Sequence, residues 1–64
     1  MTAWKLPAGA TVIDSGPTHL IWRQASPPFP DRPFVFHRVR NERLASSGEY
    51  DLTLEEAAAR RGQP

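Results

Sequence analysis

Length, composition and charge set narrow limits on this chain. It has 64 residues, no cysteine and a formal net charge of +1. The lack of cysteine excludes disulfide scaffolds and cysteine-based zinc fingers, and no run of 18 apolar residues exists to span a membrane. We expect one small domain over residues 1–64, and a cytoplasmic protein, since the N-terminus lacks the apolar stretch of a signal peptide.

The hydrophobic core available to this domain is thin. Hydrophobic residues make up 39% of the chain, and eight of them are alanines, which bury little surface. Domains near this size are at the lower limit of what folds without a metal, a disulfide or a partner. The composition therefore predicts a protein partner or a homo-oligomer.

The first part of the chain is typical of an irregular arm followed by a β-hairpin. Residues 1–9 contain proline and glycine and predict an irregular N-terminal arm. Residues 10–14 and 18–24 are rich in β-branched and aromatic side chains, which favour strands. The Ser-Gly-Pro turn at residues 15–17 joins them into a predicted hairpin.

A proline-rich segment separates this hairpin from the rest of the chain. Residues 25–33 include four prolines, which fix φ and remove backbone donors, so this segment is predicted to be a stiff loop. The next strand is predicted to end at Arg40. A tight turn at Asn41 and Glu42 and two short strands, at residues 43–45 and 49–52, are expected after it.

The chain ends with helix signals over residues 53–62. Thr53 and Glu56 have the spacing of a capping box, and Gly62 is a C-terminal stop. Several short strands followed by one helix predict an α+β domain, mainly β. We expect a small antiparallel sheet of three to five short strands with one short C-terminal helix. A small five-stranded barrel of SH3-like or OB-like shape is the alternative.

The register between residues 18–24 and 34–40 decides which side chains share a face of the sheet. In one register Leu20 and Trp22 lie beside Phe34 and Phe36, which gathers the large side chains into one core. We predict this register, because cross-strand aromatic pairs stabilise a sheet. A slip of one residue instead places the phenylalanines on the other face, together with the arginines of the strand.

The proline-rich loop is the predicted partner-binding site. Overlapping PxxP spacings with an arginine nearby are typical of segments that dock in aromatic grooves. An exposed Phe29 would be an apolar anchor on a rigid loop. The predicted contact residues are Pro28, Phe29, Pro30 and Arg32. With a sheet edge beside them, they indicate a non-catalytic protein-interaction module, such as an adaptor, an inhibitor or an accessory subunit.

The alternative function is binding of single-stranded nucleic acid. Aromatic side chains stack on unpaired bases and arginines bind phosphates, and one strand combines both types. The residues predicted for this role are Phe34, Phe36, Arg38, Arg40 and Arg43. A net charge of +1 is low for a nucleic-acid-binding domain, so the protein-interaction hypothesis is favoured.

No catalytic, cofactor or metal site is predicted. The serines lie in turns without a nucleophile pattern, and the four glycines are too scattered for a phosphate-binding loop. His19 and His37 are the only histidines, and their spacing matches no metal-ligand signature. We therefore expect a protein that is not an enzyme.

Overall fold

A computed structural model of the protein describes residues 6–41, 43–44 and 48–62. The elements, in chain order, are β1 (Thr11–Ser15), β2 (His19–Arg23), β3 (Phe34–Arg40), β4 (Arg43–Leu44), β5 (Glu49–Leu52) and α1 (Leu54–Arg61). They confirm an α+β fold that is mainly β, with bounds within about one residue of those predicted. The sheet is open and antiparallel, so the barrel alternative is not adopted. Residue 45, predicted to end the fourth strand, lies outside the described residues.

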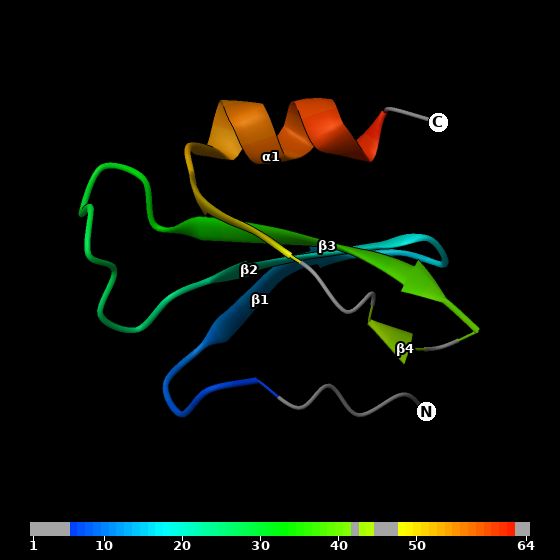
Figure 1. Ribbon diagram of the computed structural model, residues 1–64, viewed down its shortest axis with the longest axis horizontal. Helices are drawn as coiled ribbons and strands as arrows, with labels where there is room; N and C mark the ends of the chain where they lie inside the picture. Colours follow the sequence, from blue (N-terminus) through cyan, green and yellow to red (C-terminus); the bar gives the residue numbers. More distant parts are fainter. Residues whose placement is uncertain (1–5, 42, 45–47, 63–64) are drawn as a thin grey trace.

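The sheet is built around β3, which has neighbours on both sides. One edge of β3 pairs with β2, and β2 pairs in turn with β1. The other edge is shared, because β4 pairs with Val39 and Arg40 while β5 pairs around Phe34 and Phe36. All of these pairs are antiparallel. In Figure 1, α1 lies above the sheet and residues 6–10 lie below it.

The helix begins and ends at the residues that its sequence signals predict. The Thr53 hydroxyl accepts a hydrogen bond from the Glu56 backbone N–H at 3.1 Å, and the Glu56 carboxylate accepts one from the Thr53 N–H at 3.0 Å. This reciprocal pair is a complete capping box, which satisfies two donors that the first turn leaves unpaired. Gly62 ends the helix, with its N–H directed at the carbonyl groups of Ala59 and Arg60.

The register that we predicted between β2 and β3 is wrong. Leu20 is the partner of His37, and Trp22 is the partner of Val35, so the alternative register is present. It places Phe36 on the opposite face from Trp22. The physical reason is that both faces of the sheet are covered, and a single-sided core is therefore not needed.

Two thin hydrophobic clusters, one on each face, replace the single core. On the face opposite the helix, the buried cluster is Leu20, Trp22, Val35 and Val39, with Leu6 and Ala10 packed against it. Between the helix and the sheet, the buried cluster is Ile21, Phe36, Leu52 and Ala57 of α1, with the half-buried Phe34 beside it. Successive apolar side chains of β2 and β3 lie on opposite faces of the sheet, so they fill two layers.

Three local irregularities shape the sheet. A bulge between Val12 and Asp14 interrupts the β1–β2 ladder, and a second one interrupts the β3–β5 ladder. In β5, Asp51 has a φ of 59°, and Asn41 after β3 has a φ of 52°. Asp and Asn tolerate this left-handed conformation better than other non-glycine residues. This explains how β3 turns into β4 without the glycine that such turns usually contain.

Candidate functional site

The loop between β2 and β3 holds Phe29 in a fixed turn. The Arg32 N–H donates to the Phe29 carbonyl at 2.8 Å, which closes a four-residue turn with Pro30 in its second position. At the base of the loop, the Gln24 N–H donates to the Pro33 carbonyl at 2.9 Å. Phe29 is 54% exposed at the end of this braced segment. The loop therefore displays an aromatic side chain on a backbone whose proline content limits its motion.

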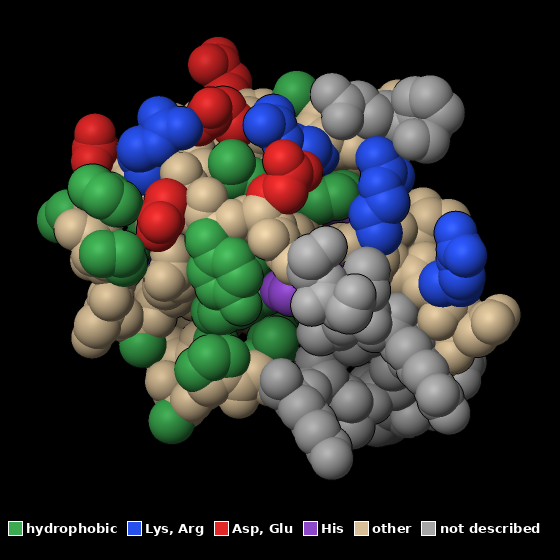
Figure 2. Space-filling view, viewed as in Figure 1, with side chains coloured by type: hydrophobic (Ala, Val, Ile, Leu, Met, Phe, Trp, Pro, Cys, Tyr) green, Lys and Arg blue, Asp and Glu red, His purple; other side chains and the backbone are tan. Residues whose placement is uncertain are grey.

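Hydrophobic side chains gather over this loop on the molecular surface. They form a patch at the left of Figure 2, where the segment between β2 and β3 lies in Figure 1. Pro28 and Pro30, both predicted contacts, are exposed together with Phe29. Three of the four predicted contact residues are therefore accessible on one stretch of backbone.

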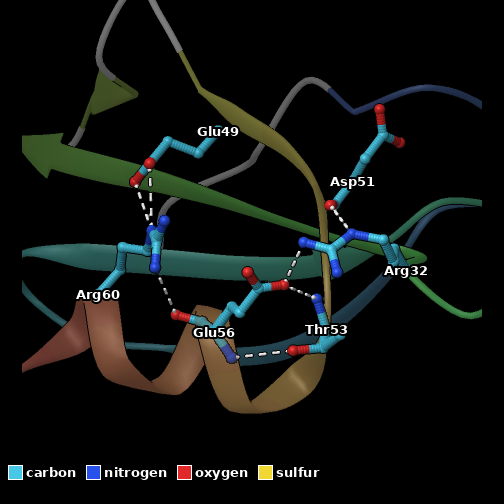
Figure 3. A network of polar contacts seen from close by, with 6 residues as sticks. All are labelled: Arg32, Glu49, Asp51, Thr53, Glu56 and Arg60. Carbon is cyan, nitrogen blue, oxygen red and sulfur yellow. Dashed lines mark hydrogen bonds and ion pairs between the residues drawn. The ribbon is translucent and has the colours of Figure 1, made fainter.

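Arg32, the fourth predicted contact, binds groups within the chain. Its Nε donates to the Asp51 carbonyl at 2.9 Å, and its Nη2 donates to the Glu56 carboxylate (Figure 3). The Gln24 side chain adds a hydrogen bond to the Asp51 carboxylate at 3.2 Å. Arg32 thus clamps the proline-rich loop to β5 and to the start of α1. We assign it a positioning role for Phe29.

The Glu56 carboxylate joins the loop to the helix N-terminus. The same oxygen, Oε1, accepts from the Thr53 backbone N–H and from the Arg32 guanidinium. These bonds, the one from Thr53 first and the one from Arg32 second, hold the pKa of Glu56 below its ordinary value. Both partners favour the charged carboxylate, so the clamp depends on its ionisation.

We expect acid to weaken the fold partly through this carboxylate. A group whose pKa is lower in the folded state contributes stability above its unfolded pKa and loses that contribution as the pH falls through its folded pKa. The urea midpoint of the wild type should therefore fall more steeply than that of Glu56→Gln between about pH 5 and about pH 3. If the urea midpoints of the two proteins fell equally steeply with pH, the ionised Glu56 carboxylate would not be stabilising the fold.

A second carboxylate, that of Asp14, should also contribute to the loss of stability in acid. Asp14 accepts hydrogen bonds from Arg61, at 2.6 Å, and from His19, at 3.0 Å. The bond from Arg61, followed by the bond from His19, lowers the pKa of Asp14. Glu56→Gln should therefore reduce the acid sensitivity without abolishing it, and adding Asp14→Asn should reduce it further.

The outer strand β1 lies next to the proline-rich loop. Thr11 at its start is the partner of Arg23, the last residue of β2. Just upstream of β1, a Cβ added to Gly9 would lie 2.7 Å from the Ala25 side chain, so the two segments are in close contact. Val12 and Ile13 of β1 are exposed by 44% and 43%. The loop and an apolar sheet edge thus meet at one end of the molecule.

In the strand predicted to bind nucleic acid, the aromatic residues pack in the protein interior. Phe36 is 2% exposed and belongs to the cluster under α1. Its ring stacks with His19, and the Arg38 guanidinium lies 5.6 Å from its centre. Phe34 is half-buried, whereas Arg38 and Arg40 are exposed. Of this predicted set, Arg38 and Arg40 are therefore the exposed members. Arg43 is the cross-strand partner of Arg40, and its side chain lies outside the described part of the chain.

The two histidines lie on opposite faces of the sheet. His19 is on the helix side, beside Asp14. His37 is buried on the other side, where its ring contacts those of Trp22 and Tyr50. Within residues 6–41, 43–44 and 48–62, no three His, Cys, Asp or Glu side chains come together to hold a metal ion. The same residues contain no helix with the length and apolarity needed to cross a membrane.

Sequence reasoning located the exposed loop but missed the residues that support it. Gln24, Asp51 and Glu56 were not predicted to contact the loop, and Arg32 was assigned to the partner instead. The capping-box position of Glu56 was the one available signal, because its carboxylate is directed toward the chain that precedes the helix. Comparison of the chain with known protein families, curated proteins and solved structures finds no match, so the function is argued from this surface alone.

Proposed function

We propose that this protein is a non-catalytic protein-interaction module, such as an adaptor, an inhibitor or an accessory subunit. Its contact surface is the tip of the proline-rich loop together with the adjoining edge strand β1. The observation that carries the proposal is Phe29, 54% exposed on a turn that the chain itself holds in place. The cysteine-free composition fits a reducing compartment, and we include a cytoplasmic location in the proposal.

The physical basis is the low cost of binding through a prearranged aromatic anchor. Burying a phenylalanine side chain contributes about 1.5–3 kcal/mol. A loop already fixed by prolines and by the Arg32 clamp loses little further entropy when a partner covers it. Aromatic residues in such positions are typical interface hot spots.

The edge strand extends this surface. β1 is the outer strand of the sheet, and an extended segment of a partner can add to such an edge through main-chain hydrogen bonds. Val12 and Ile13 supply apolar contacts beside that edge. The partner that best fits combines a pocket for Phe29 with an extended strand. In the homo-oligomer form of the proposal, the β1 edges of two copies pair with each other.

Photo-crosslinking tests the proposal directly. Benzoylphenylalanine introduced at position 29 is expected to crosslink a protein partner in a native lysate. The matched control carries the same group at position 54, because Leu54 is similarly exposed, at 51%, but lies at the start of α1. The crosslinked product should appear at position 29, be absent at position 54, and disappear when excess unlabelled wild type competes.

The mass of the crosslinked product and two treatments, nuclease digestion and high salt, separate the possible outcomes. A product of twice the monomer mass supports the homo-oligomer form of the proposal, and a heavier product supports a distinct partner. Crosslinking should persist when nuclease digestion or high salt is applied before irradiation, because the contact is apolar. Loss of all binding after nuclease treatment would favour the nucleic-acid alternative, and equal crosslinking at positions 29 and 54 would contradict the assignment to this loop.

A further inference from the structure

Asp51 has a backbone conformation that is unusual inside a strand. Its φ is 59°, in the left-handed region, although it lies within β5. Glycine adopts this conformation freely, whereas a residue with a Cβ is strained in it. Strain of this kind persists only where the surrounding structure holds the residue in place, and it is most frequent at functional sites. The contacts that hold Asp51 therefore indicate what its conformation is for.

The bulge of β5 turns Asp51 toward the proline-rich loop. In the β3–β5 ladder, Tyr50 and Asp51 together lie opposite the single residue Val35. An extra residue of this kind bends a strand and redirects its side chains. The ring of Tyr50 packs edge-on against that of Trp22, with centres 6.1 Å apart, on the face of the sheet opposite the helix. Asp51, next in the chain, contacts the loop instead.

Both polar groups of Asp51 bind the loop. Its carbonyl accepts a hydrogen bond from Nε of Arg32 at 2.9 Å (Figure 3), and its carboxylate accepts one from Nε2 of Gln24 at 3.2 Å. Gln24 directly follows β2 and Arg32 lies near the end of the loop, so one residue ties both ends. The backbone N–H of Arg32 in turn donates to the Phe29 carbonyl at 2.8 Å. The strained residue is thus joined to the turn that displays Phe29.

We propose that the left-handed backbone of Asp51 positions the proline-rich loop and thereby prearranges Phe29 for its partner. The inference rests on the proposed function and deepens it, since Asp51 acts through Arg32 and Gln24. A different backbone conformation at Asp51 would turn its carbonyl away from Arg32, and the turn at Phe29 would open more often. A loop that must be ordered during binding lowers the affinity. The backbone contributes more than the carboxylate, because the carbonyl accepts the shorter bond.

Amide hydrogen exchange, followed by NMR on the purified protein, tests this role without a partner. The reporter is the N–H of Arg32, which donates to the Phe29 carbonyl. Asp51→Ala should speed its exchange about tenfold, because alanine disfavours the left-handed conformation. Asp51→Gly should stay within about threefold of the wild type, because glycine adopts that conformation freely although it lacks the carboxylate. Equal exchange in the two variants would contradict a backbone role.

Asn41→Ala is the matched control. Asn41 also has a positive φ, 52°, but it follows the far end of β3. Each exchange rate is compared with the free energy of unfolding of the same variant from urea titration, which identifies a general loss of stability. Asn41→Ala should then leave the exchange of Arg32 unchanged. Faster exchange of Arg32 in Asn41→Ala by the same factor as in Asp51→Ala would overturn the proposal.

Crosslinking from benzoylphenylalanine at position 29 extends the test to the partner. The yield should fall in Asp51→Ala and return in Asp51→Gly. A yield that stays low in Asp51→Gly, where the exchange of Arg32 is normal, would show that the carboxylate touches the partner and would overturn the positioning role. The two proposals fail separately. Absence of a crosslink in the wild type would contradict the proposed function, whereas unchanged exchange of Arg32 in Asp51→Ala would contradict the role of Asp51.

Discussion

Phe36→Ala is expected to leave most of the protein unfolded at 25 °C. Truncation of a buried phenylalanine costs about 3–5 kcal/mol, through lost burial and the cavity left behind. The hydrophobic core of a domain this small rarely supplies more than about 3–5 kcal/mol in total. Phe36 lies at the centre of the cluster that attaches α1 to the sheet. Urea titration followed by far-UV circular dichroism will measure the loss.

Phe34→Ala is the matched control for this prediction. Phe34 is on the same face of the same strand, but it is half-buried at the margin of the cluster. We expect it to cost less than half as much as Phe36→Ala and to leave a cooperative transition. A wild-type midpoint for Phe36→Ala would show that α1 does not dock on this face. It would also restore Phe36 as a candidate for stacking with bases.

The helix was predictable because its signals are local. The capping box at Thr53 and the stop at Gly62 act within one turn of the chain, and the predicted bounds are those observed. The short strand β4 was also predicted from its local sequence, although the turn between β3 and β4 lacks glycine. Asn41 supplies the left-handed conformation that the turn needs.

The register was predicted wrongly because it depends on what covers the sheet, which we took to be one-sided. A one-sided sheet favours gathering Trp22 and Phe36 on one face, which was the basis of our prediction. In the structure, α1 covers Phe36, and residues of the N-terminal segment, Leu6 and Ala10, cover the face of Trp22. Strands buried on both faces carry apolar residues at consecutive positions, as in Leu20, Ile21 and Trp22. That run was the signal for two layers.

Only the local features of the candidate site could be predicted from the sequence. Exposure of Phe29 follows from four prolines that keep the loop out of the sheet, which is a local property. The clamp on Arg32 requires Asp51 to turn its carbonyl toward the loop at a bulge of β5. Bulges depend on how two strands of different length align, and a single sequence does not reveal that alignment.

Gly48→Ala is expected to destabilise the protein by about 1–3 kcal/mol, as over-packing does in a filled core. A Cβ at position 48 would lie 2.5 Å from Cε1 and 2.7 Å from Nε2 of His37. The imidazole is buried and has little room to move, because its ring is 6.2 Å from that of Trp22 and 6.1 Å from that of Tyr50, centre to centre. The methyl group must therefore displace either the aromatic cluster or the start of β5.

Gly62→Ala separates this clash from the general effect of losing a glycine. At position 62 the added Cβ has an ordinary contact, 3.8 Å from the Ala59 carbonyl, and the backbone has a negative φ of −85°. Alanine there should be neutral or slightly stabilising, because it reduces the entropy of the unfolded chain.

Thermal melts of both variants, with tryptophan fluorescence to follow the surroundings of Trp22, will compare them. A shared melting temperature would show that Gly48 does not abut the His37 ring. A loss confined to Gly48→Ala would place Gly48 beside the His37 ring, on the face of the sheet opposite the helix.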